Sequence, residues 1–192
     1  MPDRNDAALD FLLNRRSRPA KTLTAPVPTR EELAPILTAA LRTPDHGKLE
    51  PWRLIVLERA ALARLGELAG ARGAALGHDT TQTDKGRHQF DTGNLAVVVV
   101  DSPQDSPKVP VIEQTYSTGA VCLALLNTAL AAGWGANWLS GWPSHDREFV
   151  ETGLSLAAHE RVAGIIHIGT EKMTPPERPR PELKEKVTWQ SE

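Results

Sequence analysis

Residues 95–100 (LAVVVV) constrain the fold more than any other stretch of the chain. The run is apolar without alternation and rich in β-branched side chains, which is typical of a strand buried on both faces. Other stretches alternate between strand-like runs and helical spacing of apolar residues. Strands are expected at residues 52–57, 95–100, 134–139 and 161–168, and helices at 6–16, 29–43, 59–70 and 112–132, with a further helix between the last two strands. This order predicts one α+β or α/β domain over residues 1–192, with helices covering a small sheet.

The ends of two helices can be predicted from single residues. Thr29 and Glu32 form the T-x-x-E pattern of a capping box, in which each side chain satisfies a free backbone N–H of the other. Pro35 removes a backbone donor inside this helix, so a kink or a later start is expected. Pro44 disfavours helix at the residue before it, which places the end of the helix just before it. Gly133 stands where a left-handed residue would close the long helix.

Two segments have no clear period. Residues 71–93 are rich in Gly, Thr, His, Asp and Lys, and we predict a mobile surface segment that could serve as a lid. Residues 172–192 contain TPPERPRPELKEKVTW, which is too rich in proline for a helix. We expect this tail to run extended over a surface. No internal repeat or linker divides the chain, so both segments are assigned to the single domain.

Composition excludes several classes of protein. The chain has 192 residues, of which 40% are hydrophobic and 24% charged, as in ordinary globular domains. The formal net charge of −2 gives no reason to expect nucleic acid or an anionic membrane as a partner. Cys122 is the one cysteine, so an internal disulfide is excluded, and its apolar neighbours predict a buried, inert thiol. The acidic start (MPDRNDAALD) is unlike a secretion signal, and polar residues interrupt the longest apolar helix, so we expect a cytoplasmic protein without a membrane span.

Arg15, Arg16 and Ser17 follow the first predicted helix and allow two interpretations. Cations are favoured at a helix C-terminus by the helix dipole, and this interpretation is sufficient for the three residues taken alone. The alternative is an anion site, since two guanidinium groups and a hydroxyl match the needs of a phosphate monoester.

Residues 42–52 (RTPDHGKLEPW) join a predicted helix to a predicted strand. His46, next to Asp45, could be a metal ligand, a general base or an ordinary polar surface residue. A metal site needs more ligands at workable spacing. The candidates follow no HxxxH or CxxC pattern, so we expect no metal; they are His78, Asp79, His88 and Asp91.

Two further histidines have simpler interpretations. His159 and the adjacent Glu160 are expected in a solvated loop before a strand. His167 lies inside an apolar strand and is expected to be a hydrogen-bonded core histidine.

Residues 131–143 (AAGWGANWLSGWP) hold three tryptophans and three glycines at the entry to a strand. They could be packing residues, or they could form a flat aromatic platform with exposed backbone N–H groups for a planar ligand. The chain has no phosphate-binding loop, GxGxxG or GxSxG motif, and no catalytic carboxylate pair can be identified. An enzyme with these features would rely on a cofactor for its chemistry.

Four motifs, in order, resemble the FMN-dependent nitroreductase family, and most closely its short, YdjA-like branch of NAD(P)H nitroreductases. They are NRRSRP (14–19), LRTPDHGKLEPWRLIVLE (41–58), GWGANWLSGW (133–142) and GIIHIGTEKMTPPERPRPELKEKVTW (164–189). The resemblance implies an α+β, two-layer fold with a mostly antiparallel sheet flanked by helices. It also implies an intertwined homodimer with FMN bound at the interface by both chains.

The resemblance further implies roles for individual residues. Arg15, Arg16 and Ser17 would hold the FMN phosphate and ribityl chain and approach the pyrimidine edge. Arg42 and His46 would reach the FMN of the partner subunit. The isoalloxazine would be lined by Trp138, Leu139 and Ser140, with backbone donors near O4 and N5. Arg178 or Arg180 of the tail would contact the phosphate.

The implied activity is the transfer of hydride from NAD(P)H to flavin N5 and then of electrons to a nitroaromatic, quinone or similar acceptor, in a ping-pong cycle. No catalytic side chain is required, because the flavin carries the chemistry. The alternatives are an FMN-storage protein, another flavin reaction such as flavin fragmentation or reductive dehalogenation, and a dimeric protein without ligand.

The chain departs from the family pattern at two positions. Leu139 replaces a basic residue of close relatives, and Pro19 replaces a lysine of longer members near flavin N1, so Arg16 is the candidate for that charge.

Overall fold

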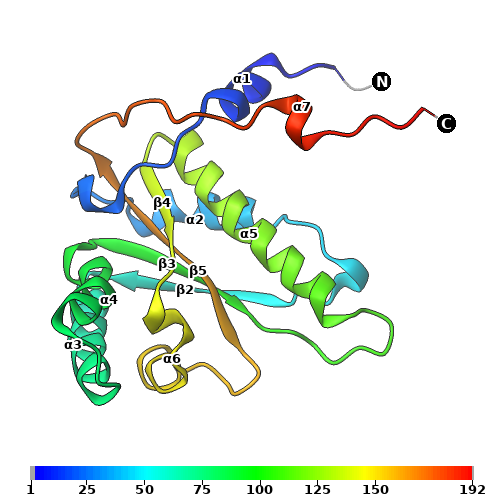
Figure 1. Cartoon of the computed structure of the whole chain (residues 1–192). Coiled ribbons are helices and arrows are strands. Elements are labelled where there is room, and N and C mark those ends of the chain that lie inside the picture. The colour runs from blue at the N-terminus through cyan, green and yellow to red at the C-terminus, as the bar shows by residue number, and fades with distance from the viewer. Residues whose placement is uncertain (1–2, 192) are drawn as a thin grey trace.

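The computed structural model describes residues 3–191 of the chain (Figure 1). Within these residues one antiparallel sheet is built from β1 (Leu23–Thr24), β2 (Trp52–Glu58), β3 (Leu95–Asp101), β4 (Gly135–Leu139) and β5 (Arg161–Glu171). The strand order is β1-β5-β3-β2, and β4 also pairs with β5. β5 is therefore the central strand, with β3 along one edge and β4 along the other, and its C-terminal end pairs with β1.

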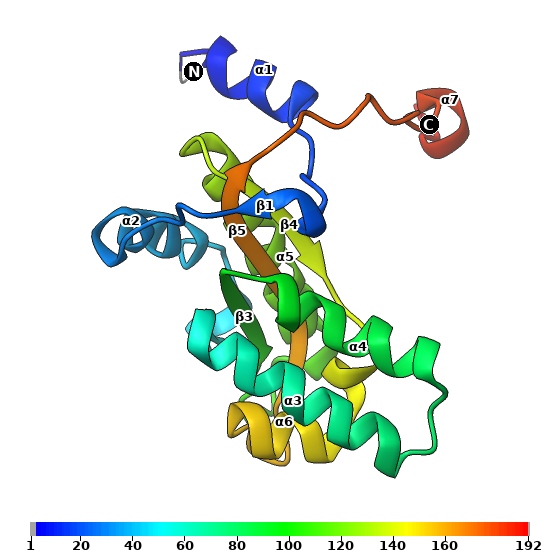
Figure 2. The same ribbon diagram turned by 90° about the vertical axis from the view of Figure 1, so that its left-hand side faces the viewer.

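Helices cover both faces of this sheet. They are α1 (Asp6–Asn14), α2 (Arg30–Ala40), α3 (Arg59–Ala75), α4 (Thr80–Thr92), α5 (Val111–Ala131), α6 (Arg147–Leu154) and α7 (Leu183–Lys186), with single 3-10 turns at Ala20–Thr22, His46–Lys48 and Trp142–His145. One core lies between the sheet and α2 and α5, and the other lies between the sheet and α3, α4 and α6 (Figures 1 and 2). This arrangement confirms the predicted α+β fold with an antiparallel sheet.

β3 shows why the LAVVVV run has no polar residue. Successive strand side chains point to opposite faces. Val97 and Val99 accordingly enter the core under α5, whereas Val98 and Val100 enter the core under α3 and α6. Because both faces of β3 are covered, every residue of the strand is buried.

Local signals fix several helix ends as predicted. Thr29 Oγ1 accepts from Glu32 N and the Glu32 carboxylate accepts from Thr29 N, so the capping box is present. Pro35 lies inside α2 without delaying its start, and the helix ends at Ala40, slightly earlier than predicted. Gly133 follows α5 with φ of 86°, the left-handed conformation expected of it.

Residues 71–93 differ from the prediction. α3 extends to Ala75, and α4 occupies most of the remaining segment. The missed signal is a second capping box, in which Asp79 caps α4 and the Gln82 side chain returns a hydrogen bond to the Asp79 backbone N–H. α4 packs against the fold with few apolar side chains, since its buried residues are Gly86, Gln89 and Phe90. The prediction that residues 71–93 lack regular structure was therefore wrong. Their mobility stays a prediction.

The two ends of the described chain lie on the outside of the fold. α1 has no buried residue, and Leu12 and Leu13 are exposed. The tail after β5 is exposed and has no regular structure apart from the single helical turn α7, and its course over a surface stays a prediction. Figure 2 shows α1 and α7 standing away from the sheet and its covering helices.

Cys122 is fully buried, as predicted, and burial raises the pKa of its thiol to about 12. None of the helices in the described part of the chain combines the length and apolar content that a membrane span requires.

Candidate functional site

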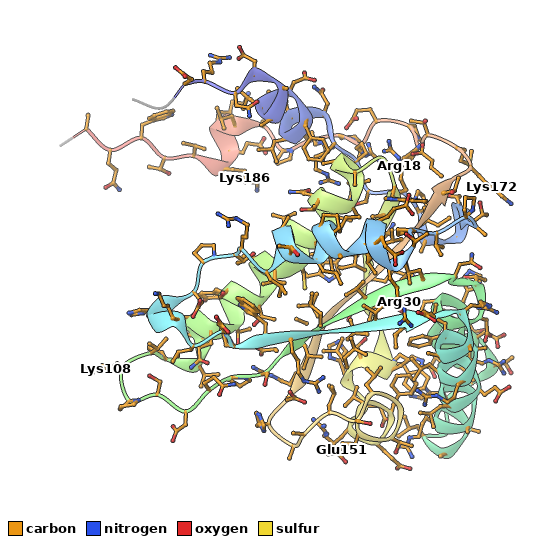
Figure 3. All side chains as sticks on the ribbon, turned by 180° about the vertical axis from the view of Figure 1, so that it is seen from behind. Arg18, Arg30, Lys108, Glu151, Lys172 and Lys186 are labelled. Atoms are coloured by element: carbon orange, nitrogen blue, oxygen red, sulfur yellow. The ribbon has the colours of Figure 1, made fainter. Side chains whose placement is uncertain are left out.

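The segment that follows α1 runs along the free edge of β4. Arg18 N donates to Ala136 O at 2.8 Å, and Asn137 Nδ2 donates to Arg18 O at 2.7 Å. Arg18, which is labelled in Figure 3, also pairs through its guanidinium with Glu171 at the end of β5. The structure therefore brings Arg15, Arg16 and Ser17 close to the strand that carries Trp138 and Leu139, although more than a hundred residues separate them in sequence.

Arg15 is the least compensated cation of this region. Its Nη2 donates to Ser17 Oγ at 3.1 Å, and its buried Nε has no hydrogen-bond partner. Burial, followed by the charges of Arg180, Arg16 and Arg18, lowers the pKa of the Arg15 guanidinium. A cavity of about 450 Å³ adjoins the group, and its lining includes Arg15, Arg16 and Arg18 as well as the carboxylates of Asp10 and Glu171. Three guanidinium groups against two carboxylates leave the lining positive, which favours an anion.

The tail contributes to the same cluster. Glu177 Oε1 accepts from Arg16 Nη1 and from Arg180 Nε, each at 3.2 Å. Arg178 donates to Glu177 through its backbone N–H, and its side chain does not take part. Of the two predicted tail arginines, Arg180 is therefore the one whose charge acts on Arg15. We call Arg15, Arg16, Arg18 and Arg180 the arginine cluster.

Two of the three tryptophans of residues 131–143, Trp138 and Trp142, have different roles. Trp142 Nε1 donates to Gln82 O at 3.0 Å, and its ring packs on Gly86, where a Cβ would overlap the indole. Trp138 packs in the same way on Gly164 of β5, yet 37% of it remains exposed. Trp142 is thus a packing residue, and Trp138 offers a supported, partly open aromatic surface.

Leu139 and Ser140 complete the predicted ligand-lining stretch. Leu139 is half-buried at the end of β4, and Ser140 is exposed. Ser140 Oγ lies 3.4 Å from His145 Nε2 in the turn that follows. Alternate residues of a strand direct their backbone groups to the same edge. Since Ala136 O faces Arg18, the backbone N–H and C=O of Trp138 face the same free edge.

Arg42 and His46 lie elsewhere in this chain. The loop that carries them packs beside the first half of α5, where His46 Nδ1 is 2.7 Å from Glu113 Oε2. α5 separates this loop from α1 and the upper end of β4 (Figure 1). Both side chains are exposed, and within one chain they do not join the arginine cluster. Their contact with a partner's cofactor stays a prediction.

One prediction about the remaining ionisable residues is wrong. Glu160 is not solvated but buried, and it accepts two hydrogen bonds of 2.7 Å from Arg53. The Arg53 guanidinium lowers the pKa of the Glu160 carboxyl to about 2. The adjacent His159 is exposed as expected.

His167 is a core histidine as predicted, with 3% exposure, and burial lowers its pKa to about 4. Its Nε2 has no hydrogen-bond partner within residues 3–191, so the expected hydrogen bond is not made at this atom. Among the former metal candidates, Asp79 caps α4 and His78 packs edge-on against Trp142.

The model of the nitroreductase family matches residues 12–170. The chain belongs to this family. The match includes the arginines that follow α1 and the whole of β4, and it ends within β5.

Individual relatives agree with this assignment. The chain is 32% identical over 166 residues to the "Putative NAD(P)H nitroreductase YdjA" of Escherichia coli (strain K12), covering 86% of this chain and 89% of that one. The structure of a nitroreductase-like family protein from Bacillus cereus is similar over 100% of this chain and 99% of its own, with 24% identity and a TM-score of 0.76. A "putative nitroreductase in complex with FMN" from Desulfovibrio desulfuricans is similar over 97% and 98%, with 19% identity and a TM-score of 0.73. The relatives thus confirm the family resemblance and the fold.

Sequence reasoning missed three residues of this region. Arg18 could have been found, because it continues the NRRSR run. Glu177 is one of many charged residues in the tail, and no local pattern distinguishes it. Gln89 lies in the segment that was read as irregular, so its burial beside the turn after β4 had no sequence signal.

Proposed function

We propose that the protein is an FMN-dependent oxidoreductase of the nitroreductase type. The observation that carries this proposal is the arginine cluster at the free edge of β4. Its members come from the segment after α1 and from the tail, and Arg15 lacks a carboxylate partner within residues 3–191. Family membership and the FMN complex of a structural neighbour support FMN as the anion.

The residues fit a flavin phosphate. Guanidinium groups bind phosphate through parallel, charge-assisted hydrogen bonds. Arg15 has an unpartnered Nε and is crowded by like charges, so an added dianion would supply hydrogen-bond acceptors and relieve the repulsion. Arg180 would hold the same phosphate from the tail, and Ser17 would bind the ribityl hydroxyls.

The end of β4 fits the ring system. Trp138 exposes its indole and directs its backbone N–H towards the free edge, and Leu139 and Ser140 follow it. Backbone donors there would bind O4 and N5 without any catalytic side chain. Arg16 would stand near the pyrimidine edge, where its charge would stabilise negative charge that develops on reduction.

Bound FMN would supply the redox chemistry, accepting hydride from NAD(P)H and passing electrons to a nitroaromatic, quinone or similar acceptor in a ping-pong cycle. The chain's own contribution would be to hold the ring at the end of β4 and to place the Arg16 charge near its pyrimidine edge.

We also propose that the working form is a homodimer. Large apolar side chains are exposed on α1, on one face of α5 and in the tail, where a second copy would cover them. They include Leu9, Leu12, Leu13, Val111, Ile112, Tyr116, Leu123, Leu183 and Trp189. Arg42 and His46 lie next to this α5 face, so each chain could offer them to the cofactor of its partner.

Spectroscopy of the purified protein tests the proposal. We expect a flavin absorption spectrum, present on purification or after addition of FMN, that is bleached by NADH or NADPH without oxygen and restored by an acceptor. Protein that does not bind FMN would refute the proposed function. Bound FMN that neither nucleotide reduces would support a storage role instead. Light scattering should show a dimer, and a monomer that binds FMN tightly would refute the shared site.

A further inference from the structure

One face of α4 is aimed at the turn that follows β4. Gln82, Gly86 and Gln89 succeed one another along this face, and Gly93 follows at the end of the helix. Gln82 O receives the Trp142 indole N–H, and Gly86 leaves room for the Trp142 ring. This packing fixes α4 against the stretch proposed to bind the flavin ring.

Gln89 occupies a special place on this face. The residue is 7% exposed, and its Oε1 is a buried oxygen without a hydrogen-bond partner. Its Nε2 lies 3.5 Å from the position that a Cβ on Gly141 would take. The side-chain amide therefore lies against Gly141, two residues beyond Leu139 at the end of β4.

The surroundings of Gln89 offer another unsatisfied group. His167 is buried on β5 opposite Asn137 of β4, and its Nδ1 is 3.0 Å from the Cβ position of Gly93. Its Nε2 has no partner among the described residues. Buried polar groups are nearly always hydrogen-bonded, so Gln89 Oε1 beside Gly141 and His167 Nε2 opposite the middle of β4 are two groups that a polar ligand could satisfy.

The hydrogen-bonding groups of the Gln89 carboxamide indicate which part of the flavin it would contact. Gln89 can accept at Oε1 and donate from Nε2, side by side in one plane. The pyrimidine ring of a flavin has a matching edge, with the N3–H donor between two carbonyl acceptors. The FMN phosphate has no such donor, and the arginine cluster is already proposed to bind it.

We propose that Gln89 recognises the pyrimidine edge of the flavin, with Oε1 accepting from N3–H and Nε2 donating to the neighbouring carbonyl. This inference rests on the proposed function, because it names a further residue for the same cofactor. It makes α4 part of the cofactor site, with Gln89 selecting a ring that carries an N3 proton.

Titrations with FMN and N3-methyl-FMN test this contact. For the wild type we expect N3-methyl-FMN to bind at least tenfold more weakly than FMN, because the methyl group removes the donor and meets Oε1. Gln89→Leu, which keeps the volume, should bind FMN roughly tenfold more weakly. It should also lose most of the discrimination between the two flavins. Flavin fluorescence and calorimetry measure both dissociation constants without turnover.

Gln104→Leu is the matched control. It makes the same substitution at an exposed glutamine in the loop after β3, where Nε2 donates to Ser102 O. This variant should keep the FMN affinity and the discrimination of the wild type. Gln89→Glu keeps the size and a hydrogen-bond acceptor, and it serves as the second variant if Gln89→Leu does not fold.

The outcomes separate this inference from the proposed function. A wild type that binds both flavins equally, or a Gln89→Leu variant that keeps full discrimination, would overturn the role of Gln89 and leave FMN binding in place. Equal loss in Gln104→Leu would also overturn it, since the effect would not be local. A wild type that binds neither flavin would refute both proposals.

Discussion

Replacement of Arg15 by methionine should separate binding from folding. Methionine keeps much of the apolar stem of arginine, so packing changes little. The substitution removes a guanidinium that is partly buried, has an unpartnered Nε and is crowded by the charges of Arg180, Arg16 and Arg18. Without flavin, the Arg15 guanidinium adds little to the stability of the fold. With FMN bound, it would be one of the main contacts to the phosphate.

The magnitudes follow from the contacts. Loss of the hydrogen bond from Arg15 to Ser17 costs about 0.5–1.5 kcal/mol. Relief of burial and of like-charge repulsion acts in the opposite direction, so the free energy of unfolding without FMN should stay within about 1 kcal/mol of the wild type. Loss of a charge-assisted contact to phosphate costs about 1.5–3 kcal/mol, which raises the dissociation constant for FMN roughly 10- to 150-fold.

Urea unfolding of the flavin-free protein and fluorescence titration with FMN measure the two effects. Arg30→Met is the matched control. Arg30 is an exposed arginine at the start of α2 that pairs with Glu58, and it lies away from the arginine cluster (Figure 3). It should leave FMN affinity unchanged. An Arg15→Met variant with less than a threefold change in affinity, or one that loses more than about 2 kcal/mol of stability without FMN, would refute the reasoning.

Three further predictions concern other parts of the chain. Glu160→Gln should lower the free energy of unfolding by about 1.5–3 kcal/mol at neutral pH, since it removes the charge that accepts two hydrogen bonds from Arg53. The pKa of Glu160 is lowered from 4.5 to about 2, so this contribution is complete above pH 4.5 and is lost as the pH falls towards 2; a wild type and variant with parallel stability curves over that window would contradict it. Gly164→Ala places a Cβ against the Trp138 indole, which should cost about 1–3 kcal/mol and weaken FMN binding, as thermal unfolding and titration would show; an unchanged protein would disprove the packing. His46→Ala should release FMN faster, by roughly threefold or more in stopped-flow displacement, with an unchanged circular dichroism spectrum, whereas full retention of FMN would remove His46 from the site.

Features of the fold that depend on local patterns could be predicted from the sequence. The buried run of β3, the capping box at Thr29 and the left-handed Gly133 are each specified by neighbouring residues. α4 was missed, although Asp79 and Gln82 form a capping box, because a helix with so few apolar residues has no visible period. Hydrophobic periodicity therefore found the core helices and failed for a helix that packs through glycines and glutamines.

The site was harder to predict than the fold, since it depends on contacts between distant segments. The arginines after α1 were recognised as an anion site through the family resemblance, but their attachment to β4 is a tertiary contact. Glu160 was misread, because its partner Arg53 is 107 residues away. Arg42 and His46 cannot be placed by one chain at all, because their proposed ligand belongs to the partner subunit.

The central position of β5 has a consequence for hydrogen exchange. β5 is paired on both edges and covered on both faces, so its amide protons should exchange only when the whole domain unfolds. α1 and the tail bury almost nothing and should exchange through local opening. The arginine cluster is thus built from the segments that open most easily, and these are attached to β4 and, through Glu171, to the end of the strand that opens last. Ligand binding would therefore protect the ends of the chain and leave exchange in the centre of the sheet nearly unaltered.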